Sequence, residues 1–280
     1  MDLVFNRLDE TVAQFTLSGA TPAFANTLRR TMIGEVPTLA IEDVRIFDNT
    51  SVLFDEILAH RIGLIPIKTD LSRFVQRNKC SCNGAGCPLC TVTFTLSVEG
   101  PKMVMSSDLI SNDPDTIPVN GNIPIVKLWE NQKIILEATA ELNIGLEHAK
   151  WQPTLACGYK EYPIINISDN CDMCGKCVDE CPRKVLEIPK KGIVQVRVVN
   201  GESKDKDCSM CCLCETICKD NDINKPSSIT IGCDSSKFIF VVESDGSLPV
   251  KEIIQKALYN IKSHSSDMVD ALKDIPVEGL

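Results

Sequence analysis

The sequence predicts an α+β protein of two or three domains, and three features indicate this class. Residues 91–98 and 134–144 alternate apolar and polar side chains, which is typical of half-buried strands in one antiparallel sheet. Segments near both ends of the chain place an apolar residue every three or four positions, as amphipathic helices do. Between them, residues 171–218 repeat one cysteine spacing, which predicts a separate metal-binding module.

The first helix is predicted to begin at Thr21-Pro22, with Thr21 as the N-cap and Pro22 at the first helical position. One face carries an apolar stripe of Phe24, Leu28 and Met32. Gly34, which precedes Pro37, is a suitable end for this helix.

The spacing of apolar residues predicts three further groups of elements. A short helix is predicted over residues 55–60, ending near Gly63, with an apolar strand over residues 64–67 directly after it. Residues 229–244 are predicted to form a pair of strands. Residues 247–264 predict a long amphipathic helix. Its apolar stripe consists of Val250, Ile254, Ala257, Leu258 and Ile261.

The strongest motif is the spacing C-x2-C-x2-C-x3-C, which occurs twice between residues 171 and 218. Bacterial-type ferredoxins use this spacing to hold two [4Fe–4S] clusters, and the fourth cysteine of each run ligates the other cluster. On that rule the first cluster is held by Cys171, Cys174, Cys177 and Cys218. The second cluster is held by Cys181, Cys208, Cys211 and Cys214. Gly175 would allow backbone amides to turn towards the first cluster.

Alternatives remain open for these runs. Zinc also binds CxxC pairs tetrahedrally, and one of the two clusters could be [3Fe–4S]. Cys212 lies directly beside Cys211 and is either a bystander or a substitute ligand, with bystander the favoured interpretation.

A second cysteine group lies in the segment CSCNGAGCPLC, where Cys80, Cys82, Cys87 and Cys90 fall within residues 80–90. Two pairs separated by a glycine-rich turn can form one closed, all-thiolate structural site, and zinc is the favoured ion. Four free thiols on a loop are the alternative. Fifteen cysteines in an intracellular chain favour metal ligands over disulfides.

Other functions are disfavoured by composition. A net charge of −9, from 29 basic and 38 acidic residues, argues against a direct nucleic-acid binder held by phosphate contacts. No stretch reaches the ~18 apolar residues of a membrane span, and the first residues lack a secretory apolar segment, so a cytoplasmic location is expected. His60, His148 and His264 lie in no catalytic motif, and the acidic residues are dispersed. The chain is predicted to have no catalytic residues of its own.

Residues 21–67 carry a family resemblance. The matching pieces are Asn26, Leu28-Arg29-Arg30, Glu35-Val36-Pro37-Thr38, Asp55-Glu56 and residues 60–66 (HRIGLIP). They resemble the signature of archaeal and eukaryotic RNA polymerase subunits related to bacterial alpha, and the archaeal D-type subunit most of all. His148-Ala149-Lys150-Trp151 with Pro153 is similar to the end of the insert domain in that family. The resemblance covers nearly the whole chain.

The resemblance implies a layout and a role. A dimerisation domain would combine residues 1–45 and 224–280, an insert domain would cover 46–166, and a ferredoxin-like domain would cover 167–223. The chain would then be a non-catalytic assembly subunit of archaeal DNA-directed RNA polymerase. It would pair with the small L-type subunit and carry other small subunits and the large catalytic subunits. Eukaryotic relatives have a zinc loop where residues 80–90 fall.

The resemblance also implies interfaces. The helix bearing Arg29 and Arg30 would face a large subunit. The stripe of the last helix would contact the small partner through Val250, Ile254, Leu258 and Ile261. Iron–sulfur clusters in such a subunit would stabilise or regulate assembly.

The alternative function is an electron-transfer protein in which a ferredoxin-type domain is fused to a docking module. A free ferredoxin needs only the cluster module, whereas here the module interrupts another fold. The sequence also shows no flavin or nicotinamide motif for a redox partner reaction. The polymerase interpretation is therefore favoured.

Overall fold

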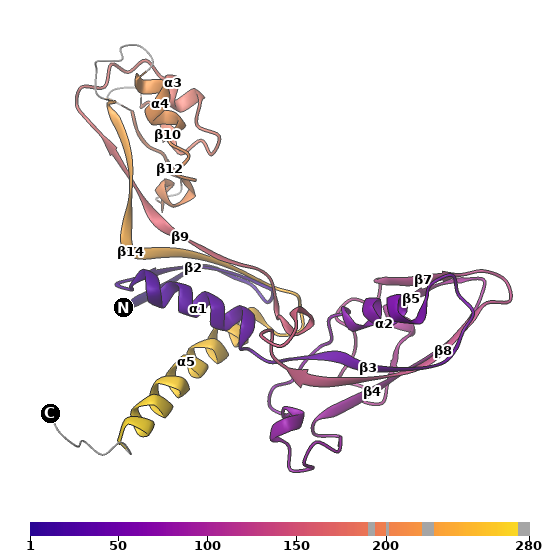
Figure 1. Ribbon diagram of the computed structural model, residues 1–280. Helices are drawn as coiled ribbons and strands as arrows, with labels where there is room; N and C mark the ends of the chain where they lie inside the picture. Colours follow the sequence, from indigo (N-terminus) through magenta and orange to yellow (C-terminus); the bar gives the residue numbers. More distant parts are fainter. Residues whose placement is uncertain (190–193, 200–201, 220–226, 274–280) are drawn as a thin grey trace. The chain divides into compact units, whose positions relative to one another are not determined.

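The computed structural model describes residues 1–189, 194–199, 202–219 and 227–273 (Figure 1). These residues form a mixed fold that is mostly sheet. Its α-helices within the described ranges are α1 (Pro22–Gly34), α2 (Asp55–Gly63), α3 (Lys176–Asp179), α4 (Leu213–Lys219) and α5 (Val250–Lys273). The chain divides into two compact units, which we describe in turn.

The first unit comprises Met1–Phe5, Phe15–Ala25 and Tyr159–Phe240. It draws on a four-stranded sheet in the order β1 (Asp2–Leu8), β2 (Val12–Ser18), β14 (Ile229–Ser244) and β9 (Thr154–Ile167). Aromatic rings fill its core: Phe15 stacks on Phe240 with centroids 4.9 Å apart, and Tyr159 lies 5.1 Å from Phe240. Strands β9 and β14 continue side by side towards α3 and α4 (Figure 1).

The cysteine runs lie at the end of this β9–β14 ribbon. Two short antiparallel pairs accompany α3 and α4: β10 (Leu186–Glu187) with β11 (Gln195–Val196), and β12 (Val198–Val199) with β13 (Glu202–Ser203). A small core gathers buried residues from both runs and from the ribbon. Its members are Cys177, Leu186, Val194, Cys214 and Ile229. Two of the cysteines are therefore part of the packing of this region.

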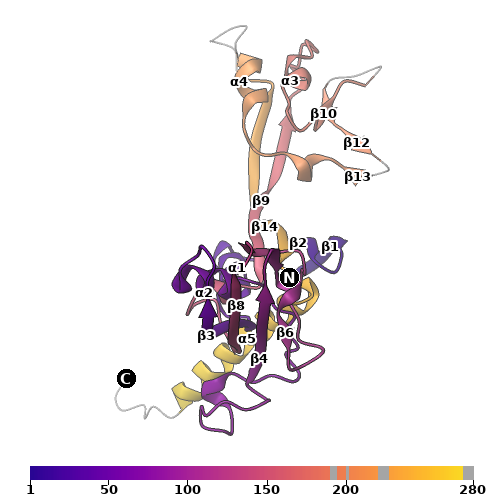
Figure 2. The same ribbon diagram turned by 90° about the vertical axis from the view of Figure 1, so that its right-hand side faces the viewer.

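The second unit comprises Asn6–Gln14, Asn26–Gly158 and Val241–Leu280. Its main sheet has the order β3 (Thr38–Asn49), β8 (Lys133–Asn143), β4 (Thr91–Glu99) and β6 (Ile110–Ser111), with antiparallel pairing throughout (Figure 2). A separate pair joins β5 (Lys102–Met105) to β7 (Pro124–Leu128). Helix α2 packs against β3 and β7 and closes one core.

Several sequence predictions are confirmed. The Phe24 N–H donates to Thr21 Oγ1 at 3.2 Å, so Thr21 caps α1 as expected. Helix α2 covers the predicted short helix and ends at Gly63. Strands β4 and β8 pair antiparallel, with Phe94 opposite Ala138 on the buried face. Alternation alone was sufficient for these two strands because one face of the sheet is buried.

Two predicted elements are wrong. Residues 64–67 form no strand and make only an isolated bridge between Ile67 and Pro118, because Pro66 has no N–H to offer a ladder. Residues 229–244 form one continuous strand, not a pair. The Asp234 carboxylate accepts hydrogen bonds from the Ser236 N–H and Oγ, and this turn-like motif is accommodated without reversing the chain.

Helix α5 runs further than residues 247–264, from Val250 to Lys273. Four positions in its first two turns are buried, which are Val250, Ile253, Ile254 and Ala257. Its later turns expose apolar side chains, which are Leu258, Met268, Val269 and Leu272. One helix therefore has an interior half and an uncovered half.

Removing the ring at the centre of the aromatic stack should destabilise the first unit. Phe240→Ala deletes a fully buried side chain that touches two other rings, and we expect a loss of about 3–5 kcal/mol in the free energy of unfolding. Urea denaturation followed by circular dichroism measures this loss. The matched control is Phe47→Ala, because the Phe47 ring is 61% exposed. Equal losses for both variants would contradict the packing described here.

Candidate metal centres

The loop of residues 80–90 is shaped to bring its four thiols together. It follows a 3-10 turn, η1 (Arg77–Lys79), and leads into β4. Asn83, Gly84 and Gly86 adopt positive φ angles of 52°, 82° and 88°, which turn the chain back on itself. Glycine takes this conformation without a steric penalty, so the GAG sequence between the cysteine pairs has a direct structural use.

The four sulfur atoms converge. Sγ separations are 3.6 Å for Cys80 and Cys87, 3.6 Å for Cys82 and Cys90, and 3.8 Å for Cys87 and Cys90. All four Sγ atoms lie within 4.8 Å of one another. Thiolates bound to one tetrahedral ion at about 2.3 Å would stand about 3.8 Å apart, so this geometry suits a single metal ion.

The environments of these thiols are unequal. A hydrogen bond from the Gly86 N–H lowers the pKa of Cys82 to about 6, whereas burial raises the pKa of Cys90 to about 12. The Cys87 N–H donates to Cys90 Sγ at 3.3 Å. A bound cation would bring all four thiols to the thiolate form, because metal coordination outweighs the burial penalty.

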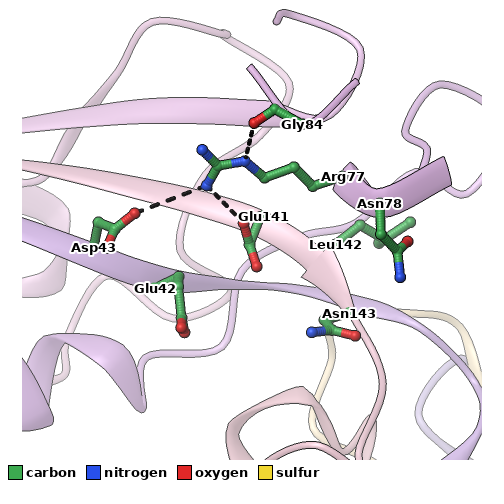
Figure 3. Close-up of a pocket in the computed structure, with 8 residues that line it drawn as sticks. All are labelled: Glu42, Asp43, Arg77, Asn78, Gly84, Glu141, Leu142 and Asn143. Atoms are coloured by element: carbon green, nitrogen blue, oxygen red, sulfur yellow. Dashed lines mark hydrogen bonds and ion pairs between the residues drawn. The ribbon is translucent and has the colours of Figure 1, made fainter. Parts of the chain in front are cut away.

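Arg77 anchors this loop to the sheet (Figure 3). Its Nε donates to the Gly84 carbonyl at 2.9 Å. Its Nη1 lies 3.2 Å from Glu141 Oε2 and 3.9 Å from Asp43 Oδ2. The hydrogen bond to Glu141 raises the pKa of Arg77. The loop tip, β8 and β3 are thus joined by one guanidinium, which sequence analysis did not single out.

The two cysteine runs at the end of the β9–β14 ribbon have matching backbones. The third residue of each is left-handed, with φ of 58° at Met173 and 54° at Met210. The fifth residue is also left-handed, with φ of 79° at Gly175 and 59° at Cys212. Helices α3 and α4 begin directly after these fifth residues. The repeat in sequence is therefore also a repeat in conformation.

The first predicted ligand set lies close together. Burial, together with the nearby charges of Cys171, Cys174 and Cys218, raises the pKa of the Cys177 thiol to about 11. Cys218 belongs to the second run, so this neighbourhood crosses between the runs. It is the combination expected for the first cluster.

The second predicted ligand set lines one cavity. Cys181, Cys208, Cys211 and Cys214 all contribute to its wall, together with Cys212 and apolar residues of the ribbon. Burial raises the pKa of Cys214 to about 11, with contributions from Cys208 and Cys181. Two sulfur atoms accept backbone hydrogen bonds of 3.4 Å, Cys181 from Val185 and Cys208 from Met210.

Cys212 has a different role from its neighbours. Its thiol donates to the Met210 carbonyl at 3.6 Å, within its own turn. It occupies the left-handed position that is glycine in the first run. Burial raises its pKa, and the Glu215 carboxylate adds to that rise. These contacts favour a bystander over a ligand.

Strand β9 contacts the second run through two side chains that sequence analysis missed. Lys160 Nζ donates to the Cys208 carbonyl at 2.7 Å, and the Tyr162 hydroxyl donates to Asp205 at 3.0 Å. Burial lowers the pKa of Lys160, while the charges of Cys208 and Asp207 oppose that shift. Burial, with Asp205, raises the pKa of Tyr162 to about 12. Their spacing of two residues on a strand is the only sequence signal that could have paired them.

The residues expected at subunit interfaces differ in exposure. Arg29 is half-buried and donates to Asn26 Oδ1, whereas Arg30 is exposed. Val250 and Ile254 are buried within this chain, Ile261 is half-buried, and Leu258 is 40% exposed.

The three histidines form no catalytic group in the part of the chain that the structure describes. His148 Nδ1 accepts the Lys150 N–H at 3.1 Å, and His264 lies 3.6 Å from Glu35 on an exposed part of α5. His60 borders the same hollow as His148, and Lys150, which also lines it, pairs with Glu42. Across the described ranges, no helix combines the length and apolar character needed to span a bilayer.

Comparison with known proteins identifies the family. Residues 44–156 match the model of the RNA polymerase Rpb3/RpoA insert domain. DNA-directed RNA polymerase subunit Rpo3 of Methanosarcina acetivorans is 43% identical over 279 residues, covering 98% of this chain and 99% of the relative. Rpo3 of Archaeoglobus fulgidus is 44% identical over 94% of both chains. Rpo3 of Methanothermobacter thermautotrophicus is 39% identical over 96% of this chain and 98% of the relative.

Two designations from the sequence resemblance are corrected by these matches. The relatives carry the designation Rpo3, not the D-type designation. The alpha-like partner of Rpo3 in the polymerase is accordingly Rpo11, not the L-type subunit. The resemblance in residues 21–67 thus indicated the right kind of polymerase component, whereas both designations were wrong. The chain belongs to the Rpo3 family of archaeal DNA-directed RNA polymerase subunits, which are non-catalytic by themselves and act in catalysis only as part of the complex.

Proposed function

We propose that this chain is an Rpo3-type assembly subunit that pairs with Rpo11, carries two [4Fe–4S] clusters in a ferredoxin-like domain, and holds structural zinc in the loop of residues 80–90. The ferredoxin-like domain would cover residues 167–223. The dimerisation domain would combine residues 1–45 and 224–280, and the insert domain would cover residues 46–166. The clusters stabilise or regulate assembly.

One observation supports the cluster assignment above others. The cavity at the end of the ribbon is lined by four predicted ligands of the second cluster, and one of them, Cys181, comes from the other run. Likewise, Cys218 of the second run lies near Cys177 of the first run, together with Cys171 and Cys174. A crossed exchange is the arrangement that two-cluster ferredoxins require, and independent zinc sites on each run would not need it.

Zinc suits the loop of residues 80–90 because the site is closed. Four thiol ligands leave no position for substrate, and Cys80 and Cys90 are buried. Arg77 ties the loop to two strands, so a metal here would stabilise the edge of the insert-domain sheet. When bound, zinc would supply a cross-link between the two halves of the loop.

The uncovered half of α5 supports pairing with Rpo11. Its apolar side chains recur at helical spacing along one stripe, which consists of Leu258, Ile261, Met268, Val269 and Leu272. Such a stripe on a solvent-facing helix suits a partner helix. Val250 and Ile254 would contribute indirectly, by fixing α5 to its own unit.

Electron transfer is the weaker proposal for the clusters. The family match covers nearly the whole chain, so the cysteine module belongs to a polymerase subunit and is not a separate ferredoxin. The described residues show no cofactor pocket that would serve a redox partner reaction beside the clusters. A structural or regulatory role needs no such partner.

Replacing two ligands of the first cluster should remove that cluster alone. For the variant Cys171→Ser with Cys174→Ser, we expect iron content to fall to about half after anaerobic purification. Co-purification with Rpo11 should persist, because the α5 stripe is untouched. The matched control Cys212→Ser should keep all its iron, since that thiol bonds the Met210 carbonyl. Loss of iron from the control would make Cys212 a ligand instead.

Metal analysis should find about one zinc per chain, bound by the loop. The variant Cys82→Ser with Cys90→Ser should lose this zinc and become sensitive to protease within residues 80–90, because the two halves of the loop are no longer tied. The variant Cys233→Ser, an exposed thiol on β14, should retain zinc and resistance. Full zinc content in the double variant would rule out the loop as the binding site.

A charge placed on the α5 stripe should weaken pairing. Met268→Glu puts a carboxylate on a side chain that is 67% exposed in this chain, and we expect at least about a tenfold loss of affinity for Rpo11. Ser266→Glu adds the same charge to the same helix away from the stripe and should change affinity little. Isothermal titration of the two purified proteins measures both. Equal effects would place the Rpo11 surface elsewhere.

A further inference from the structure

We propose that Lys160 is a positioning residue for the second iron–sulfur cluster, fixing its ligand loop to β9 and raising the reduction potential of that cluster. This inference rests on the cluster assignment proposed above. It adds a residue outside both cysteine runs and an asymmetry between the two clusters.

The contact itself is strong and specific. Lys160 Nζ donates to the carbonyl of Cys208, a predicted ligand, at 2.7 Å. A charged donor makes this bond stronger than an ordinary amide contact. Lys160 is half-buried on a long strand, so its ammonium is held by the ribbon and is not a freely moving surface charge.

A second contact from the same strand supports the same loop. Tyr162 follows Lys160 by two residues and therefore points to the same side of β9. Its hydroxyl donates to Asp205 at 3.0 Å, three residues before Cys208. Lys237 of β14 lies over the Tyr162 ring, 3.6 Å from its centroid, and restrains it from the neighbouring strand. Lys160 and Tyr162 thus hold residues 205–208 at two points.

The first cysteine run is joined to the ribbon by neutral groups at its start. The Ser168 N–H donates to the Ser228 carbonyl at 2.8 Å, and Ser228 Oγ donates to the Asn170 carbonyl at 3.3 Å. These bonds position the loop without placing a charge beside Cys171. The two runs share a backbone conformation, but they are attached to the ribbon differently.

The charge of Lys160 has a chemical consequence. A [4Fe–4S] cluster with thiolate ligands is negatively charged, and reduction adds one more negative charge. A cation fixed beside a ligand stabilises the reduced form more than the oxidised form, so it raises the potential. Asp205 and Asp207 lie in the same turn: Asp205 accepts from Tyr162, and Asp207 pairs with Lys204 at 3.3 Å while its charge also acts on Lys160. The Lys160 ammonium faces Cys208 itself.

The test compares four variants of the full chain, each reconstituted anaerobically with iron and sulfide. Lys160→Met removes the charge and keeps the stem, and Lys160→Arg restores the charge. Tyr162→Phe removes only the hydroxyl bond to Asp205. Lys251→Met removes one exposed positive charge on α5 and controls for net charge. Redox titration monitored by electron paramagnetic resonance gives the two midpoint potentials, and a chelator assay gives the rate of iron loss.

We expect Lys160→Met to lower one midpoint potential and leave the other unchanged, with faster loss of about half the iron. Lys160→Arg should restore the potential. Tyr162→Phe should speed iron loss without moving the potential, because it loosens the loop but keeps the charge. If the two midpoint potentials of Lys160→Met equal those of the unaltered chain, the inference about Lys160 is wrong and the cluster proposal stands. Absence of iron from the unaltered chain would overturn the cluster proposal and the inference with it.

Discussion

Pairing of β9 with β14 is the constraint on which the cysteine region depends. The described residues between these strands share a small apolar core, and two of its members are themselves cysteines, Cys177 and Cys214. Such a segment gains little from burial, so its conformation relies on the ribbon beneath it and on whatever its thiols bind. The ribbon in turn is held by ring stacking, with Phe240 on β14 against Phe15 and Tyr159. The stacked aromatic rings thus support the ribbon from which the cysteine region extends.

The loop of residues 80–90 likewise combines its own turns with a contact to the neighbouring sheet. Its turns are made by left-handed residues and its thiols converge, yet its link to the sheet depends on Arg77. Arg77 is paired with Glu141, whose side chain is mostly buried, so this ion pair is less screened than an ordinary surface bridge. A long cationic side chain helps to attach each cysteine region to its sheet, Arg77 in one case and Lys160 in the other.

The apolar residues of helix α5 fall into a buried group and an exposed group. Val250, Ile253, Ile254 and Ala257 in its first turns are buried. The continuing stripe is left exposed, and a stripe of this kind is unfavourable in water unless something covers it. The amphipathic pattern is continuous along the helix, so the pattern alone does not show where the interior ends and the proposed interface begins.

The sequence by itself determined the features that depend on neighbouring residues. Thr21 caps α1, β4 and β8 alternate, and the four thiols of residues 80–90 converge, because caps, periodicity and short loops act over a few positions. The tertiary structure decided the rest. It made residues 229–244 one strand, turned the Cys212 thiol towards Met210 and brought Lys160 to Cys208. The Lys160 contact joins positions 48 residues apart, and only the pairing of distant strands can specify such a contact.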